Sequence, residues 1–324
     1  MSEARTAVGV DIGGTKTAVG LVREDGTVLA RAETRTPAAA GADAVLATAR
    51  ELAAQLIADA DEKVHAVGVG AAGVIDPQQR LVLSATDTLP GWAGTQIGER
   101  LEDALALPVA VDNDVRAHAV GEARCGAGRG RGSALVIAAG TGVGGALVLD
   151  GRPLIGATGI AGHFGHIPSV EAEGLPCTCG RSGHLEMIAS GPAVLAAYLR
   201  AQGTSAIPAG DLDTRDVFAL AQHGDAVARA VIATAGRALG RAVGGLVNAL
   251  DPEIVIIAGG LSHTSDLWWE PLRAGFRQEA IDLVSGCPLT RAELGADAAI
   301  VGAAMLAFDT LSTRPHPAST GIRS

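Results

Sequence analysis

Two glycine-rich turns, Gly13-Gly14 and Gly140–Gly145, restrict the folds open to this chain of 324 residues. Each turn separates two apolar runs: 8–12 and 18–22 around the first turn, 133–139 and 146–149 around the second. Apolar runs joined by a short glycine turn are typical of β-hairpins. Because each half of the chain opens with this hairpin pattern, we expect a duplicated domain whose two copies face a cleft.

The rest of the chain alternates strand and helix patterns, which indicates an α/β protein. Apolar residues recur at three- and four-residue spacing in three expected helices: 42–60, 225–250 and 297–311. Further strands are expected at 28–32, 64–71, 108–111 and 254–258. We place one domain at 1–121 and the other at 122–311, with the last helix packing back on the first domain. Residues 312–324 are expected to be a frayed tail.

Charge and hydropathy exclude two classes of partner. The formal net charge is −10, and Lys and Arg form no run along the sequence. A protein that binds duplex nucleic acid needs cations to displace the phosphate counterions, so we expect no nucleic-acid partner. The sequence has no run of about 18 uninterrupted apolar residues and no apolar signal core near its start. We therefore expect no membrane partner and a cytoplasmic location.

The second turn matches the G-x-G-x-x-G pattern of dinucleotide-binding proteins, but a strand pattern follows it where that fold requires a helix. A Walker phosphate loop is excluded, because no lysine in the chain follows a glycine. We interpret both turns as hairpin tips whose backbone N–H groups bind phosphate oxygens. The alternative is two tight turns that need glycine only for a positive φ.

The candidate phosphate-binding residues follow from this interpretation. The first turn offers Gly13, Gly14, Thr15 and Lys16, with Asp11 placed to hold a metal-bound water. The second turn offers Gly140, Thr141 and Gly142, where the threonine could add a hydroxyl group.

A cluster of potential metal ligands follows the second turn. Cys177, Cys179 and His184 lie within eight residues, and His166 lies eleven residues before Cys177. Two cysteines and two histidines form a closed tetrahedral zinc set, which favours a structural ion over a catalytic zinc with an open position. The alternative is a set of unrelated polar residues in a glycine-rich loop.

The sequence Asp11-Ile-Gly-Gly-Thr-Lys16, the turn at Gly140 and the block 162–186 together resemble the ROK family (repressors, open reading frames, sugar kinases) over about residues 6–310. The resemblance implies the actin/hexokinase-type ATPase fold, with ATP, Mg²⁺ and a structural Zn²⁺ as cofactors. It also implies a homodimer or homotetramer. By the same resemblance, Gly259-Gly260 is the turn on the adenosine side, and Gly73 belongs to the loop on the acceptor side.

Asp114 is the candidate catalytic residue, at the end of a predicted strand. When an alcohol attacks the γ-phosphate of ATP, a positioned group must accept its proton. The family's Asn-Asp pair matches Asn113, which would bind the acceptor, and Asp114, which would be the base. The alternative is an Asx turn that caps the following helix.

The sugar side of the family motif departs from the usual pattern at two positions. The resemblance assigns sugar hydroxyls to His163, His166 and Glu186, but His163 stands where the family motif has a glutamate. Imidazole in place of a carboxylate changes which hydroxyl pattern is satisfied, and it resembles N-acetylmannosamine kinases. The segment Leu89-Pro-Gly-Trp92 instead resembles glucokinases. In the metal cluster, His184 replaces the third cysteine of the family.

Together these features predict an ATP-dependent kinase that phosphorylates a hydroxyl, the 6-OH, of a hexose or N-acetylhexosamine. A kinase of a sugar-like cyclitol, a non-catalytic sugar-binding or regulatory ROK protein, and a zinc hydrolase are the alternatives. The family's repressors carry an N-terminal helix-turn-helix extension, whereas the first strand pattern here begins within about ten residues. We therefore favour an enzyme over a repressor.

Overall fold

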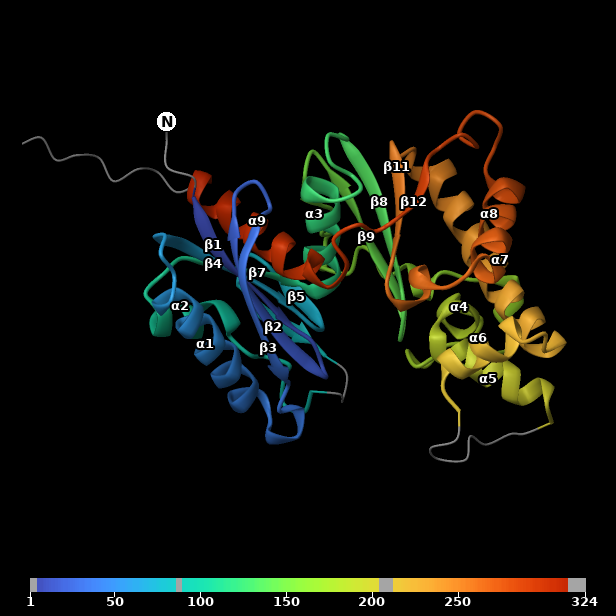
Figure 1. Ribbon diagram of the computed structural model, residues 1–324, viewed down its shortest axis with the longest axis horizontal. Helices are drawn as coiled ribbons and strands as arrows, with labels where there is room; N and C mark the ends of the chain where they lie inside the picture. The colour runs from blue at the N-terminus through green and yellow to red at the C-terminus, as the bar shows by residue number, and fades with distance from the viewer. Residues whose placement is uncertain (1–4, 86–88, 204–211, 314–324) are drawn as a thin grey trace, which may run out of the picture. The chain divides into compact units, whose positions relative to one another are not determined.

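A computed structural model describes residues 5–85, 89–203 and 212–313 of the chain (Figure 1). The chain divides into two compact units. Unit 1 extends to Cys125 and resumes at Ala296, and unit 2 comprises Gly126–Gly295. The tail predicted at 312–324 begins inside the last helix, and its residues from 314 onward lie outside the described residues.

Unit 1 is built on a five-stranded sheet in the order β3-β2-β1-β4-β7. Its strands are β1 (Thr6–Ile12), β2 (Lys16–Arg23), β3 (Val28–Arg35), β4 (Val64–Ala71) and β7 (Val109–Asn113). The pairs β3/β2 and β2/β1 are antiparallel, whereas β1/β4 and β4/β7 are parallel. A separate short hairpin consists of β5 (Val74–Asp76) and β6 (Leu81–Ser84).

Unit 2 repeats this topology in the order β10-β9-β8-β11-β12. Its strands are β8 (Ser133–Ala139), β9 (Val143–Leu149), β10 (Arg152–Pro153), β11 (Ile254–Ala258) and β12 (Leu289–Arg291). Again the first two pairs are antiparallel and the last two parallel. The duplication predicted from the two glycine turns is therefore present in both strand order and strand direction.

Four helices complete unit 1: α1 (Ala42–Ala58), α2 (Ile97–Leu105), α3 (Asp114–Cys125) and α9 (Ala298–Thr313). The last helix lies against β1, β4 and α3 (Figure 1). Glycine allows this close approach. A Cβ atom at Gly9 or Gly68 would lie 1.8 Å from a carbonyl oxygen of α9, and one at Gly302 would lie 1.7 Å from Ala117 O of α3.

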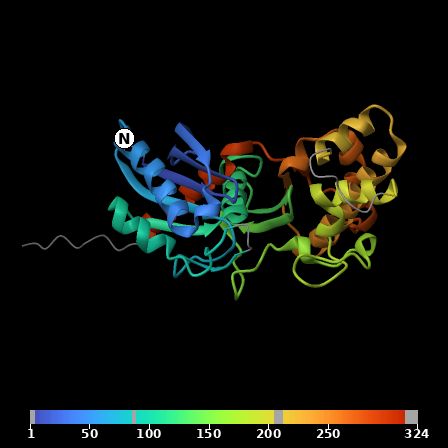
Figure 2. The same ribbon diagram turned by 90° about the horizontal axis from the view of Figure 1, so that it is seen from below.

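Unit 2 contains α4 (Glu186–Ala189), α5 (Gly191–Ala201), α6 (Thr214–Gln222), α7 (Ala226–Leu250) and α8 (Asp266–Glu279). In Figures 1 and 2, α7 and α8 lie side by side in the yellow-orange to orange part of the chain. A Cβ atom at Gly236, Gly240 or Gly244 of α7 would lie within 2.8 Å of a carbonyl oxygen of α8. These helical glycines therefore permit tight helix packing.

Helix α7 is long and apolar enough, by length and composition alone, to cross a membrane. Its buried residues include Ile232, Leu239, Val243 and Val247, which belong to the hydrophobic core of unit 2. The apolar character of α7 is accounted for by this packing, because core helices of globular domains are also apolar.

Candidate functional site

The first glycine turn connects β1 and β2 in unit 1. The N–H of Gly13 donates to Lys16 O at 3.0 Å and closes the turn. The N–H groups of Gly14 and Thr15 donate to no acceptor in the part of the chain that the structure describes. Lys16 Nζ lies 3.1 Å from Glu33 Oε2 on β3. The turn thus presents two backbone donors, as an anion-binding turn must.

The second turn, between β8 and β9, is built in the same way. The N–H of Gly140 donates to Gly142 O at 2.9 Å, and Gly140 O accepts from Gly191 N–H at 2.8 Å. Within the described ranges, the N–H groups of Thr141 and Gly142 donate to no acceptor. Both hairpins therefore leave two adjacent N–H groups free directly after the closing glycine.

The alternative interpretation of these turns, that their glycines serve a positive φ, is wrong. Among the described residues, no glycine of either turn has a φ in the left-handed region. In the second turn, close contacts account for the glycines instead. A Cβ atom at Gly142 would lie 2.6 Å from Glu186 Oε2, and one at Gly145 would lie 2.0 Å from Val136 O and 2.9 Å from the Phe164 ring.

A cavity of about 690 Å³ in unit 2 is lined by Gly140 and Thr141 of this turn and by Gly260. The structure does not place Gly142 or Gly259 in its lining. Gly259 has φ +83°, and a Cβ there would lie 2.4 Å from Ala139 O, so this glycine lets the end of β11 approach β8 closely.

The other walls of this cavity were not predicted from the sequence. They come from the start of α5, from α6 and from the segment 261–265 after β11, and they include Pro192, Thr214, Arg215, Phe218 and Gln222. The available signal was the Ser190-Gly-Pro192 segment, since a serine cap followed by proline in the first turn is typical of a helix start. The cavity combines an aromatic side chain, polar side chains and the free N–H group of Thr141, which suits a nucleotide.

Asn113 and Asp114 lie where β7 ends and α3 begins. Asn113 Oδ1 accepts from the N–H groups of Val115 (3.0 Å) and Arg116 (3.1 Å), so the Asx cap that was the alternative interpretation is present. Asn113 Nδ2 donates to Gly73 O at 2.9 Å and to Asp114 Oδ1 at 2.8 Å. The same side chain therefore caps the helix, holds the Gly73 loop and orients the carboxylate of Asp114.

Burial raises the pKa of Asp114, although hydrogen bonds from Val115 and Asn113 act in the opposite direction. Asp11, near the end of β1, has its pKa raised to about 7, mainly by burial and then by the negative charge of Asp114. Lys16 and Arg31 lower the pKa of Asp11 by smaller amounts. A carboxylate with raised proton affinity, as at Asp114, is suited to accept a proton near neutral pH.

A buried ion pair supports this corner of unit 1. Arg116 Nε donates to Asp112 Oδ1 at 2.6 Å, and Arg116 Nη2 donates to Ile75 O at 3.2 Å. The side chain of Arg116 is 2% exposed. It thereby ties the start of α3 to β7 and to the β5–β6 hairpin. Arg116 was not predicted from the sequence; its signal there was a spacing of four residues from Asp112.

The Gly73 loop is fixed by its own contacts. Gly73 has φ +106°, and a Cβ there would lie 2.6 Å from Ser84 O, so the position requires glycine. The fully buried Trp92 donates its indole N–H to Ala72 O at 2.9 Å. The segment Leu89–Trp92 therefore supports the loop that we expected on the acceptor side.

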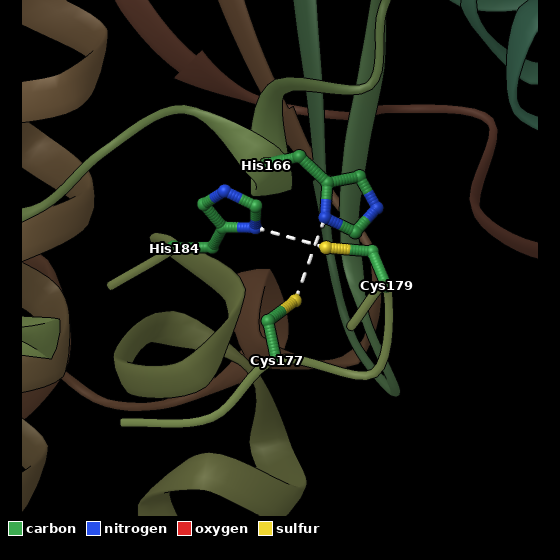
Figure 3. Close-up of side chains that lie close together, drawn as sticks. All are labelled: His166, Cys177, Cys179 and His184. Atoms are coloured by element: carbon green, nitrogen blue, oxygen red, sulfur yellow. Dashed lines mark hydrogen bonds between the residues drawn. The ribbon is translucent and has the colours of Figure 1, made fainter. Parts of the chain in front are cut away.

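The predicted zinc ligands are brought together in unit 2. In Figure 3 the side chains of His166, Cys177, Cys179 and His184 point toward one another, and their ligand atoms all lie within 4.8 Å of each other. His166 Nδ1 lies 3.6 Å from Cys177 Sγ, and His184 Nδ1 lies 3.2 Å from Cys179 Sγ. Tetrahedral zinc would separate such atoms by about 3.6 Å, given Zn–S of about 2.3 Å and Zn–N of about 2.0 Å. The four side chains fit the ion.

Of the three residues assigned to the sugar, His166 belongs to this cluster, and His163 and Glu186 each lie within three residues of one of its members. The rings of His163 and His166 are stacked, with centroids 6.1 Å apart. His163 Nδ1 lies 2.8 Å from Ile160 O, which can only accept, so this nitrogen carries the proton and Nε2 is the acceptor in the neutral ring. Glu186, at the start of α4, accepts from Val143 N–H at 2.9 Å. The sugar loop and the second turn are therefore in direct contact.

Comparison with known proteins agrees with this arrangement. The sequence profile of the ROK family matches residues 7–310. The chain belongs to the ROK family. A glucokinase of Halalkalibacterium halodurans is 33% identical over 93% of this chain and 94% of its own length. An N-acetylmannosamine kinase of Yersinia pestis is 32% identical over 93% of this chain and 98% of its own.

Solved structures place this ROK protein in the actin/hexokinase-type ATPase fold. The crystal structure of a ROK family glucokinase from Streptomyces griseus, in complex with glucose and AMPPNP, superposes with a TM-score of 0.77 at 34% identity. The alignment covers 94% of this chain and 99% of that one. The predicted family and fold are both confirmed.

Proposed function

We propose that this ROK protein transfers the γ-phosphoryl group of ATP to a hydroxyl group, the 6-OH, of a hexose or N-acetylhexosamine. The observation that carries the proposal is the carboxylate of Asp114, held by Asn113 and Val115 and raised in proton affinity by burial. Relatives named as glucokinase and N-acetylmannosamine kinase, each about one-third identical over nearly the whole chain, support it.

In this proposal the free N–H groups of the two turns bind phosphate oxygens, and the cavity beside Gly140 and Gly260 takes the nucleoside. Mg²⁺, when bound, would neutralise charge on the transferred phosphate, with Asp11 holding one of its waters. The acceptor hydroxyl attacks the γ-phosphorus, the bond to the bridging oxygen breaks, and ADP leaves. Asp114 accepts the proton of the hydroxyl.

The tautomer of His163 bears on which sugar is accepted. With Nδ1–H engaged by Ile160 O, His163 presents an imidazole ring where the family motif has a carboxylate. We propose that His163, His166 and Glu186 contact sugar hydroxyls, and that the imidazole in place of a carboxylate favours N-acetylmannosamine over glucose. The zinc ion would be structural and would hold the loop that carries these residues. We also propose a cytoplasmic homodimer or homotetramer.

The test is release of ADP from ATP and Mg²⁺ with a panel containing glucose, N-acetylmannosamine and a cyclitol. The wild-type protein is expected to turn over with a sugar, and Asp114→Asn is expected to lose at least a hundredfold in kcat because the proton acceptor is gone. Asp103→Asn, which changes an exposed carboxylate of the same unit, is the matched control. Equal turnover by Asp114→Asn and Asp103→Asn would refute the assignment of the base.

A further inference from the structure

The second glycine turn carries three consecutive backbone N–H groups, from Thr141, Gly142 and Val143, and they differ in whether they already donate a hydrogen bond. The first two donate to no acceptor among the residues described. The third donates to Glu186 Oε2 at 2.9 Å. One of the three donors that could bind a phosphate is therefore already bonded to a carboxylate, and that carboxylate has the same sign of charge as the phosphate.

The contact between Glu186 and the turn depends on glycines on both sides. A Cβ atom at Gly142 would lie 2.6 Å from Glu186 Oε2, so any larger residue there would displace the carboxylate. A Cβ at Gly165 would lie 2.2 Å from Val143 O and 3.2 Å from Glu186 Cβ. The sequence thus keeps space open at two points for this carboxylate to reach the turn.

Glu186 is also placed to respond to the sugar. It follows the metal ligand His184 by two residues, and it begins α4 directly after the metal loop. Only Oε2 bonds to Val143. The bond from the Val143 N–H is charge-assisted, and a sugar hydroxyl that donates to the same carboxylate would share that negative charge and weaken the bond.

We propose that Glu186 withholds the Val143 N–H from the phosphates of ATP until a sugar hydroxyl binds its carboxylate. This inference rests on the proposed function, in which Glu186 contacts the sugar. Sugar binding releases the third N–H to the phosphates, so ATP then binds more tightly. Binding of the sugar before ATP is therefore favoured over the reverse order, which limits phosphoryl transfer to water while the acceptor is absent.

The decisive measurement is the affinity for AMPPNP with Mg²⁺ in the absence of sugar, by titration calorimetry. Glu186→Ala frees the Val143 N–H and removes the charge, so it is expected to bind AMPPNP about tenfold more tightly than the wild type. Glu186→Gln keeps an acceptor oxygen but loses the charge, and an intermediate gain is expected. Glu173→Ala removes the same charge from an exposed position of the loop and should leave the affinity unchanged.

A merely structural role for Glu186 would give the opposite sign, because loss of support for the turn weakens nucleotide binding. Zinc content and hydrogen exchange over residues 162–186 show whether each variant keeps the loop folded. If folded Glu186→Ala and Glu186→Gln bind AMPPNP no more tightly than the wild type, the inference is overturned. If the wild-type protein binds no AMPPNP, the proposed function itself fails, and this inference fails with it.

A second arm adds glucose or N-acetylmannosamine, whichever the wild type phosphorylates. The sugar is expected to tighten AMPPNP binding to the wild type about tenfold and to leave Glu186→Ala unchanged. A wild-type affinity for AMPPNP that does not respond to a phosphorylated sugar would also overturn the inference.

Discussion

Replacing Asp11 by Asn should stabilise unit 1 in a pH-dependent way. The folded carboxyl has a pKa of about 7, against an ordinary value of 3.8, because it is buried and faces the charge of Asp114. Between these two pH values the unfolded chain has lost the proton while the folded protein keeps it. Unfolding then releases a proton, so the stability of the wild type falls as the pH rises through this window and levels off above it.

The size of the effect follows from the same two values. At 1.36 kcal/mol per pH unit, ionising Asp11 costs the folded state up to about 4 kcal/mol at pH 8. Between pH 5 and pH 8 the wild type should therefore lose about 3 kcal/mol of stability relative to Asp11→Asn, which has no proton to release there. The raised pKa values of Asp112 and Asp114 contribute in both proteins, so the difference between the two curves reports Asp11 together with its coupling to Asp114.

Hydrogen exchange of the β1 amides, compared between the two proteins at each pH, isolates unit 1 from the unfolding of unit 2. Asp103→Asn, at an exposed position on α2, is the control and should follow the wild type. Parallel curves for the wild type and Asp11→Asn from pH 5 to pH 8 would refute the reasoning, because the buried carboxyl would then be ionised at no cost in stability.

Three other perturbations test the packing, the metal loop and the sugar contact. Gly240→Ala places a Cβ 1.9 Å from Leu272 O and should destabilise unit 2 by about 3 kcal/mol in thermal unfolding. Gly245→Ala on the same helix meets nothing within 4 Å and should stabilise it by about 0.5–1 kcal/mol; equal effects would contradict the packing argument. Cys177→Ser should abolish zinc binding and raise hydrogen exchange over residues 162–186 but not in β1; unchanged exchange in that loop would exclude a structural ion. His163→Glu restores a charged acceptor and should raise kcat/KM for glucose over N-acetylmannosamine about tenfold; an unchanged ratio would show that His163 does not set the preference.

Much of the fold could be predicted because its central strands are continuous apolar runs. β4, β8 and β11 have the bounds expected from the sequence, since strands covered on both faces need no alternation with polar residues. The edge strands β10 and β12 were not predicted. They contain two and three residues, and only their pairing with β9 and β11 defines them. Helix α3 was expected only under the alternative interpretation, as the helix capped by an Asx turn, because its start overlaps the Asn113-Asp114 pair that we interpreted as chemistry.

The candidate site was predictable where its residues are close in sequence, as in the metal cluster. It was not predictable where the chemistry depends on pairs distant in sequence. The raised pKa of Asp11 requires Asp114, and the blocked N–H of Val143 requires Glu186. In each pair, no local sequence pattern around one residue points to the other. The two residues of a pair meet only because strand order and loop packing bring distant parts of the chain together.

The glycines of this chain show how one residue type serves several physical requirements. In α7 and at the contacts with α9 they remove a side chain that would collide with a carbonyl oxygen. At Gly73 the backbone conformation itself requires glycine. In the second turn, however, the absent side chain at Gly142 makes room for the carboxylate of Glu186, a functional group rather than backbone. An alanine at Gly142 should therefore alter nucleotide affinity through Glu186, whereas an alanine at Gly240 should alter stability alone. Gly142 belongs to a pattern that matches a phosphate-binding motif, but in this structure glycine is required there because the carboxylate of Glu186 occupies the space.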